Sequence, residues 1–212
     1  MPKLLKARRH YAPELYADGG LWERDLEAMR PIVTLSLTRW VRKHCGPGST
    51  SLWRLSHRAD PRALPLADRH YNRQKPGTPQ FVPPGSCLVL LTPQADAFWV
   101  SGRPNPAYVR HAWPGAWVCN AFRNEGPCLS SDLIREAVAI TRWAWGDPPP
   151  LGMVTFVDTT KVRRKRDWGR CYRKAGWTPL PQRTKGGLFV LQLRPEDFPA
   201  RIAPVGSELD LF

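Results

Sequence analysis

The sequence predicts an α/β domain, because apolar runs typical of strands alternate with one amphipathic segment. Residues 86–93 and 97–102 are two apolar runs around a polar turn, the pattern of an antiparallel hairpin. Residues 133–145 repeat apolar side chains on one helical face. Two further runs with strand character, 115–124 and 153–157, lie on either side of that helix. Strands and helix in this order indicate a domain that packs a helix on a sheet.

The chain before the hairpin is harder to assign. Residues 1–20 are basic and then glycine-rich without a clean period, which predicts a poorly ordered arm. A helix is expected over residues 32–45, between Pro31 and the stop at Gly46. We therefore divide the chain into a basic N-terminal extension with one or two helices (1–62), a catalytic domain (63–198) and a C-terminal tail (199–212).

The elements after residue 124 have clearer ends. Ser130 or Ser131 is expected to cap the amphipathic helix, with Asp132 favourable beside the positive end of its dipole. The proline-rich segment 146–150 ends that helix. A short helix over 168–174 with Gly176 as its C-cap, and a last strand over 187–193, complete the domain.

Charge points to a polyanionic partner. The 32 Lys and Arg against 18 Asp and Glu give a formal net charge of +14 and a pI near 10.2, for which nucleic acid is the leading explanation. No segment approaches the ~20 apolar residues that span a bilayer, and the N-terminus lacks the apolar core of a signal peptide. We expect a soluble, cytoplasmic protein that binds nucleic acid and no membrane.

Cysteine usage agrees with a reducing compartment. The five cysteines form no CxxC pair and no short Cys/His spacing, so neither a disulfide framework nor a zinc site is indicated.

The end of the strand over 153–157 is the most informative place in the chain. Asp158 stands where this strand reaches the surface, and a dense group of cations follows it. These cations are Lys161, Arg163, Arg164, Lys165 and Arg166. Chemistry and nucleic acid could meet here; a solvated basic loop after an ordinary core strand is the alternative.

The order of elements over residues 66–195 resembles the GNAT acyltransferase superfamily. The resemblance implies a central mixed, mostly antiparallel sheet flanked by helices, and a loop whose backbone N–H groups bind the pyrophosphate of acyl-CoA. The corresponding residues are Arg123, Asn124, Gly126, Ser130 and Ser131. The match departs from the family pattern at Pro127, which has no N–H donor, and at Cys128. An ordinary Asn/Gly turn before a helix is the alternative.

Five short motifs in order resemble the bacteriophage Mom family of DNA-modifying proteins. They are the His-Tyr pair at 70–71, NAFRNEG, SSDL, TFVD and GRCYRKAGW. The resemblance implies transfer of a small acyl-type or carbamoylmethyl-type group to the N6 amine of adenine in double-stranded DNA, an anti-restriction activity encoded by a phage or prophage. It implies catalytic roles for His70, Tyr71, Asp158 and Tyr172, and acetyl-CoA and iron as cofactors.

The chemistry of these side chains fits such a reaction. His70 could act as a general base or, with Asp158, as a metal ligand. Tyr172 takes the position of a general acid by resemblance. Arg73 and Lys75 beside the His-Tyr pair would add a second basic rim for DNA phosphates. Two alternatives stay open: a GNAT N-acetyltransferase acting on a small amine, protein or RNA, and a non-catalytic nucleic-acid-binding protein.

Overall fold

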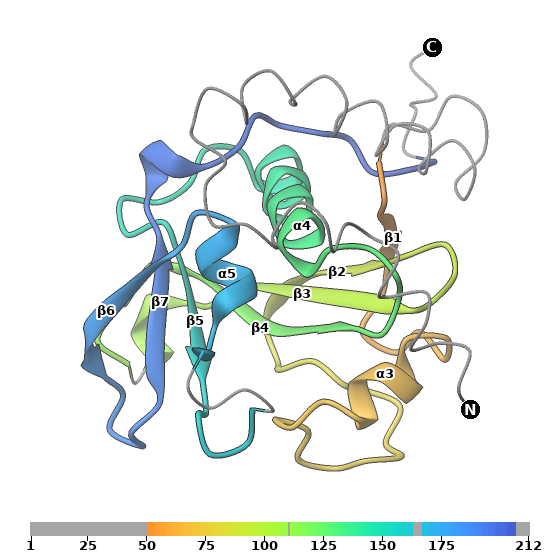
Figure 1. Ribbon diagram of the computed structural model, residues 1–212, viewed down its shortest axis with the longest axis horizontal. Helices are drawn as coiled ribbons and strands as arrows, with labels where there is room; N and C mark the ends of the chain where they lie inside the picture. The colour runs from red at the N-terminus through yellow and green to blue at the C-terminus, as the bar shows by residue number, and fades with distance from the viewer. Residues whose placement is uncertain (1–50, 110, 163–166, 207–212) are drawn as a thin grey trace, which may run out of the picture. The chain divides into compact units, whose positions relative to one another are not determined.

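Seven strands form one sheet, in the order β1-β2-β3-β4-β5-β7-β6 (Figure 1). The computed structural model describes residues 51–109, 111–162 and 167–206. The strands are β1 Arg54–Ser56, β2 Ser86–Leu91, β3 Ala97–Arg103, β4 Trp117–Asn124, β5 Met153–Val157, β6 Thr178–Arg183 and β7 Phe189–Leu193. Only the β4–β5 pair is parallel. The structure is therefore an α/β protein with a mixed, mostly antiparallel sheet, as predicted.

Few helices accompany the sheet. They are α3 Leu64–Asp68, α4 Ser130–Trp145 and α5 Arg170–Lys174, with 3-10 turns at Pro106–Tyr108 and Pro195–Asp197. No helix in the described ranges is long and apolar enough to cross a membrane. The predicted arm over 1–20, the predicted helix over 32–45 and the cations at 163–166 lie outside the described residues.

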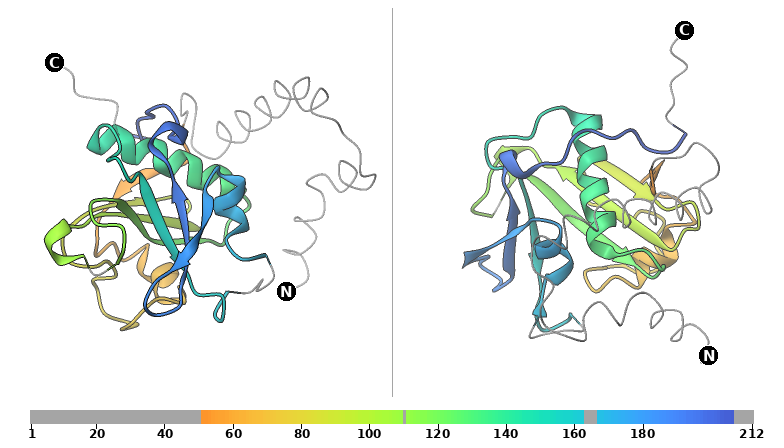
Figure 2. Two further views of the ribbon diagram at one scale, coloured as in Figure 1. Left: turned by 90° about the vertical axis from the view of Figure 1, so that its left-hand side faces the viewer. Right: turned by 45° about the horizontal axis from the view of Figure 1, so that its top comes forward.

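The sheet has a helix-bearing layer on each side (Figures 1 and 2). Alternate side chains of β3 show this: Phe98 and Val100 pack with Leu66 of α3. On the opposite face, the Ser101 hydroxyl lies 2.7 Å from the hydroxyl of Thr141 in α4. Because strand side chains alternate between faces, the apolar runs of β2 and β3 can fill both layers.

The hairpin, β4, α4, β5, α5 and β7 confirm the predicted elements to within a few residues. Two strands were missed. β6 carries Pro179 and Pro181, which argue against a strand, but it lies at a sheet edge where missing N–H donors are tolerated. β1 pairs with β2, and residues 51–62 belong to the compact unit Ser51–Phe212. Residues 51–62 therefore lie in the same compact unit as residues 63–198.

The predicted cap of α4 is wrong. Leu129 is the N-cap residue and offers no side-chain hydrogen bond, while the Ser130 hydroxyl accepts from the Asn124 amide at 3.1 Å. Asp132 does lie in the first turn. At the end of α5, Ala175 is the C-cap and Gly176 follows with φ 96°, the left-handed conformation that glycine adopts readily.

Two irregularities of β4 shape the candidate site. The pairing with β3 shifts between Val100 and Ser101, which pair with Ala121 and Cys119, so Asn120 is an extra, bulged residue. The pairing with β5 ends at Cys119–Thr155. Beyond that pair the two parallel strands diverge (Figure 1). We call the opening between them the fork.

Candidate functional site

Tyr71 lies at the fork. Its hydroxyl donates to the Phe156 carbonyl at 3.3 Å, on the part of β5 that no longer pairs with β4. Burial raises the pKa of Tyr71, and a hydrogen bond from the Asp158 backbone opposes that rise. The Tyr71 ring thus joins the segment after α3 to the end of β5, which are far apart in the sequence.

His70 stacks on Tyr71, with ring centroids 4.6 Å apart and planes at 25°. Its Nδ1 accepts from the Asn72 N–H at 3.2 Å. Burial, with a smaller contribution from the positive charge of Arg123, lowers the pKa of His70 to about 4. The imidazole is therefore neutral at pH 7.

Tyr172 of α5 approaches the same place from the opposite face of the sheet. Its hydroxyl lies 3.4 Å from Sγ of Cys119, the last β4 residue paired with β5. Burial raises the pKa of Cys119 to about 12 and holds that of Tyr172 well above its ordinary value. Both groups are protonated at neutral pH, so Tyr172 is a potential proton donor and Cys119 is not a thiolate nucleophile.

The backbone of Asp158 lies beside Tyr71 at the fork, whereas its carboxylate contacts the turn that follows β5. Oδ1 accepts from the Thr160 N–H at 2.9 Å and from its hydroxyl at 2.6 Å, while Oδ2 lies 3.8 Å from Nζ of Lys161. The pKa of Asp158 is lowered, and the hydrogen bond from the Thr160 hydroxyl is the largest cause. The carboxylate therefore stabilises the turn after β5.

The described residues do not complete a metal site. No group of three His, Cys, Asp or Glu side chains converges within the described ranges. His70 Nδ1 and Asp158 Oδ1, the two predicted ligands, both accept hydrogen bonds from their own loops. The iron that the resemblance implies finds no complete ligand set in this part of the chain.

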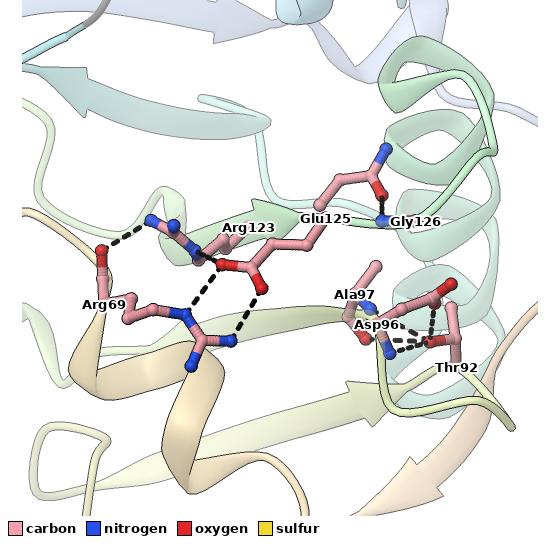
Figure 3. A network of polar contacts seen from close by, with 8 residues as sticks. Arg69, Thr92, Asp96, Ala97, Arg123, Glu125 and Gly126 are labelled. Atoms are coloured by element: carbon pink, nitrogen blue, oxygen red, sulfur yellow. Dashed lines mark hydrogen bonds and ion pairs between the residues drawn. The ribbon is translucent and has the colours of Figure 1, made fainter. Parts of the chain in front are cut away.

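In the predicted anion loop, residues 123–131, several polar groups form hydrogen bonds within the loop or with neighbouring residues. Arg123 Nε donates to Glu125 at 2.6 Å, and the Arg69 guanidinium donates two hydrogen bonds of 2.9 and 2.6 Å to the same carboxylate (Figure 3). The Gly126 N–H, expected to face an anion, donates to the Asn124 side chain at 2.9 Å. The Asp96 carboxylate adjoins Gly126, where any added Cβ would overlap it. Two of the groups expected to bind the pyrophosphate, the Arg123 guanidinium and the Gly126 N–H, therefore donate to other residues of the protein.

The predicted basic rims differ in availability. The Arg73 side chain is only 9 % exposed and its guanidinium is engaged by Asp68 at 2.8 Å and by the carbonyls of Thr78 and Gln80. Arg73 thus fixes its own loop and has little capacity left for a phosphate. Lys75 and Lys161 are exposed to solvent.

Two adjoining cavities lie on the α3 side of β4. One of about 410 Å³ is lined by His70, Phe81 and Phe98, and one of about 330 Å³ by His111 and Phe156. Both volumes are in the range of small-ligand pockets. The cavities share Asn72, Pro83 and Asn120, so these residues stand between them.

Sequence reasoning missed Asn120 and His111. Asn120 lines both cavities next to a bulge, and the segment WVCNAFRN contains no glycine or proline to signal that bulge. His111 lies 5.1 Å from the Phe156 ring, and burial lowers its pKa. The only signal in the sequence that could have identified His111 is its residue type.

Comparisons with protein-family models, curated proteins and solved structures find no match to this chain.

Proposed function

We propose that this chain is a GNAT-like transferase that modifies the N6 amine of adenine in DNA with a small acyl-type or carbamoylmethyl-type group. The observation that carries the proposal is the meeting of His70, Tyr71 and the Asp158 backbone at the fork, with Tyr172 close by. These residues come from three separate elements, and the resemblance to the Mom family picks out the same four. The adjoining cavities supply room for a substrate.

Protonation states at the fork suit transfer to an amine. The N6 amine of adenine is a weak nucleophile because its lone pair is delocalised, so holding it against the activated carbon is a major part of catalysis. Neutral His70 can accept the proton that the amine loses once its Nδ1 releases the Asn72 N–H. Tyr172, which keeps its proton at neutral pH, can give one to the leaving group.

DNA must bring the base to the cavity. An adenine in a duplex is stacked and paired, so it has to be flipped out, at a cost of a few kcal/mol. Contacts from exposed cations such as Lys75 and Lys161 to phosphates can offset that cost. The net charge of +14 supports this partner over a small free amine.

Neither cofactor enters the proposed steps. The loop at 123–131 and the pair His70 and Asp158 are engaged within the protein, and the mechanism uses only side chains at the fork. A donor other than acetyl-CoA is compatible with the proposal.

Nucleoside mass spectrometry tests the function. DNA from cells that produce the protein is digested and compared with DNA from cells carrying the empty vector. We expect a new, heavier adenosine derivative in the first sample alone. An unchanged adenosine pool, together with acylated protein or RNA, would favour the N-acetyltransferase alternative.

The DNA partner has its own test. Replacement of Arg163, Arg164, Lys165 and Arg166 by Gln should weaken binding and flatten its salt dependence, by about one unit of the log–log slope for each lost phosphate contact. An unchanged slope would remove this segment from the DNA interface.

A further inference from the structure

The bulged residue Asn120 presents a free carboxamide to both cavities. Asn120 follows Val118 by two residues and shares its face of the sheet, and the bulge places Ala121 on that face as well. Asn120 lines the cavities beside residues of the α3 face such as Phe98 and Val118. Among the described residues, its amide group makes no hydrogen bond, which leaves one acceptor and two donors for a ligand.

Gly102 holds this amide in place. Gly102 of β3 pairs with Val118, two residues before Asn120, and a Cβ built on it would overlap Nδ2 of Asn120. The absence of a side chain at this position leaves room for the amide against Gly102. Replacing Gly102 by Ala would displace the amide without removing it.

The walls of the cavities are aromatic. His111 and Phe156 lie with centroids 5.1 Å apart on one side of Asn120, and His70 meets Phe98 edge-on at 6.3 Å on the other. Aromatic rings accept flat π-systems, whereas a carboxamide needs a polar edge with a donor beside an acceptor. A planar heterocycle with such an edge fits both features.

We infer that Asn120 recognises the flipped adenine base, an inference that rests on the proposed function and names its specificity residue. The Asn120 carbonyl would accept from the N6 amine while its NH₂ donates to N7, the pairing by which asparagine distinguishes adenine. Guanine presents two acceptors at that edge, so the Asn120 carbonyl would face an oxygen. The second N6 hydrogen stays free to face the fork.

Base preference can be measured directly. Labelled duplexes carrying one unpaired adenine, one unpaired guanine or one abasic site are titrated with the protein, since an unpaired base flips at low cost. We expect the adenine duplex to bind about tenfold or more tightly than the guanine duplex. Asn120→Leu and Gly102→Ala should both lose this ratio and keep the affinity for the abasic duplex.

Two further variants test whether the lost preference is specific to the Asn120 amide. Asn120→Asp keeps the size of the side chain and the acceptor but removes the donor to N7, so it should also lose the ratio. Gly186→Ala is the matched control, because its Cβ would meet no atom closer than 3.9 Å, and it should bind like the wild type. Melting curves check that each variant folds.

Failure of this inference and failure of the proposed function are distinguishable. Modified adenosine in cells together with an unchanged ratio in Asn120→Leu would overturn the role of Asn120 and leave the function standing. If the wild-type protein binds no DNA, the proposed function is refuted, and the base site is then tested by titration with free adenosine. Adenosine binding by the wild type that is lost in Asn120→Leu would support the base site. No binding of adenosine by the wild type in that case would overturn it.

Discussion

The loop at 123–131 and the fork between β4 and β5 are joined by one strand, yet they treat polar groups in opposite ways. In the loop, the Arg123 guanidinium and the Gly126 N–H both donate hydrogen bonds to neighbouring residues. At the fork, Asn120 has an amide with no described partner, and cavities of about 410 and 330 Å³ adjoin it. The loop carries the clearer motif, but the fork has the free groups.

This difference shows what a short motif can and cannot indicate. A motif such as R-x-x-G indicates where an anion site could form, because glycine allows exposed N–H groups before a helix. Whether those groups are available depends on partners elsewhere in the chain, such as Arg69, which lies 56 residues before Glu125. Contacts of this kind decide which of two candidate regions can accept a ligand.

The largest expected stability effect is the difference between substitutions at Arg73 and at Lys75, the two cations predicted to form a basic rim beside the His-Tyr pair. Arg73→Ala removes a nearly buried guanidinium and leaves Asp68 and two carbonyls without their donor, so the free energy of unfolding should fall by ~3 kcal/mol. Lys75→Ala, at an exposed position in the same loop, should change it by less than ~0.5 kcal/mol. Equal costs in urea unfolding would contradict the structural role of Arg73.

An intermediate effect should appear on acidification. The folded pKa of His70 is about 4 against an ordinary 6.5, so the unfolded chain binds more protons between these values and stability falls as the pH drops from 6.5 to 4. The loss at this residue should reach about 2–3 kcal/mol at most.

The matched variant isolates that contribution. Burial raises the pKa of Glu136, which acts in the opposite direction, so the difference between wild type and His70→Gln is the quantity to measure. The wild type should lose more stability than the variant between pH 6.5 and 4. Parallel pH curves would show that the ring is not desolvated at the fork.

The smallest effect concerns the engaged loop. Glu125→Gln should cost less than ~1 kcal/mol, because the ion pairs of Glu125 are partly exposed. It should also release the guanidinium groups of Arg69 and Arg123 and raise the affinity for pyrophosphate, measured by calorimetry. Glu196→Gln, which loosens an exposed pair with Arg194, is the control and should not alter pyrophosphate binding. No gain in Glu125→Gln would mean that Glu125 is not what keeps anions out.

Periodicity predicted most of the fold. The continuous apolar runs of β2, β3 and β5 and the helical period of α4 reflect which side chains are buried, and this information is local. β6 was missed because its prolines are tolerated only at an edge, and being at an edge is a property of the whole sheet.

The candidate site was only partly predictable. Asp158 was correctly placed at the end of a strand, but the turn that takes up its carboxylate depends on Thr160. Asn120 was invisible because its bulge arises from the pairing of β4 with β3, not from any residue that favours one. The engagement of Arg73 and Arg123 likewise needed the positions of Asp68 and Glu125.

Nucleoside mass spectrometry on two variants compares the regions most directly. DNA is isolated from cells producing Tyr172→Phe, which removes the proton donor at the fork, and from cells producing Arg123→Ala, which changes the engaged loop. We predict a loss of modified adenosine on the order of a hundredfold for Tyr172→Phe, with little change in melting temperature, and near wild-type modification for Arg123→Ala. Full modification by Tyr172→Phe together with its loss in Arg123→Ala would contradict the assignment of the chemistry to the fork.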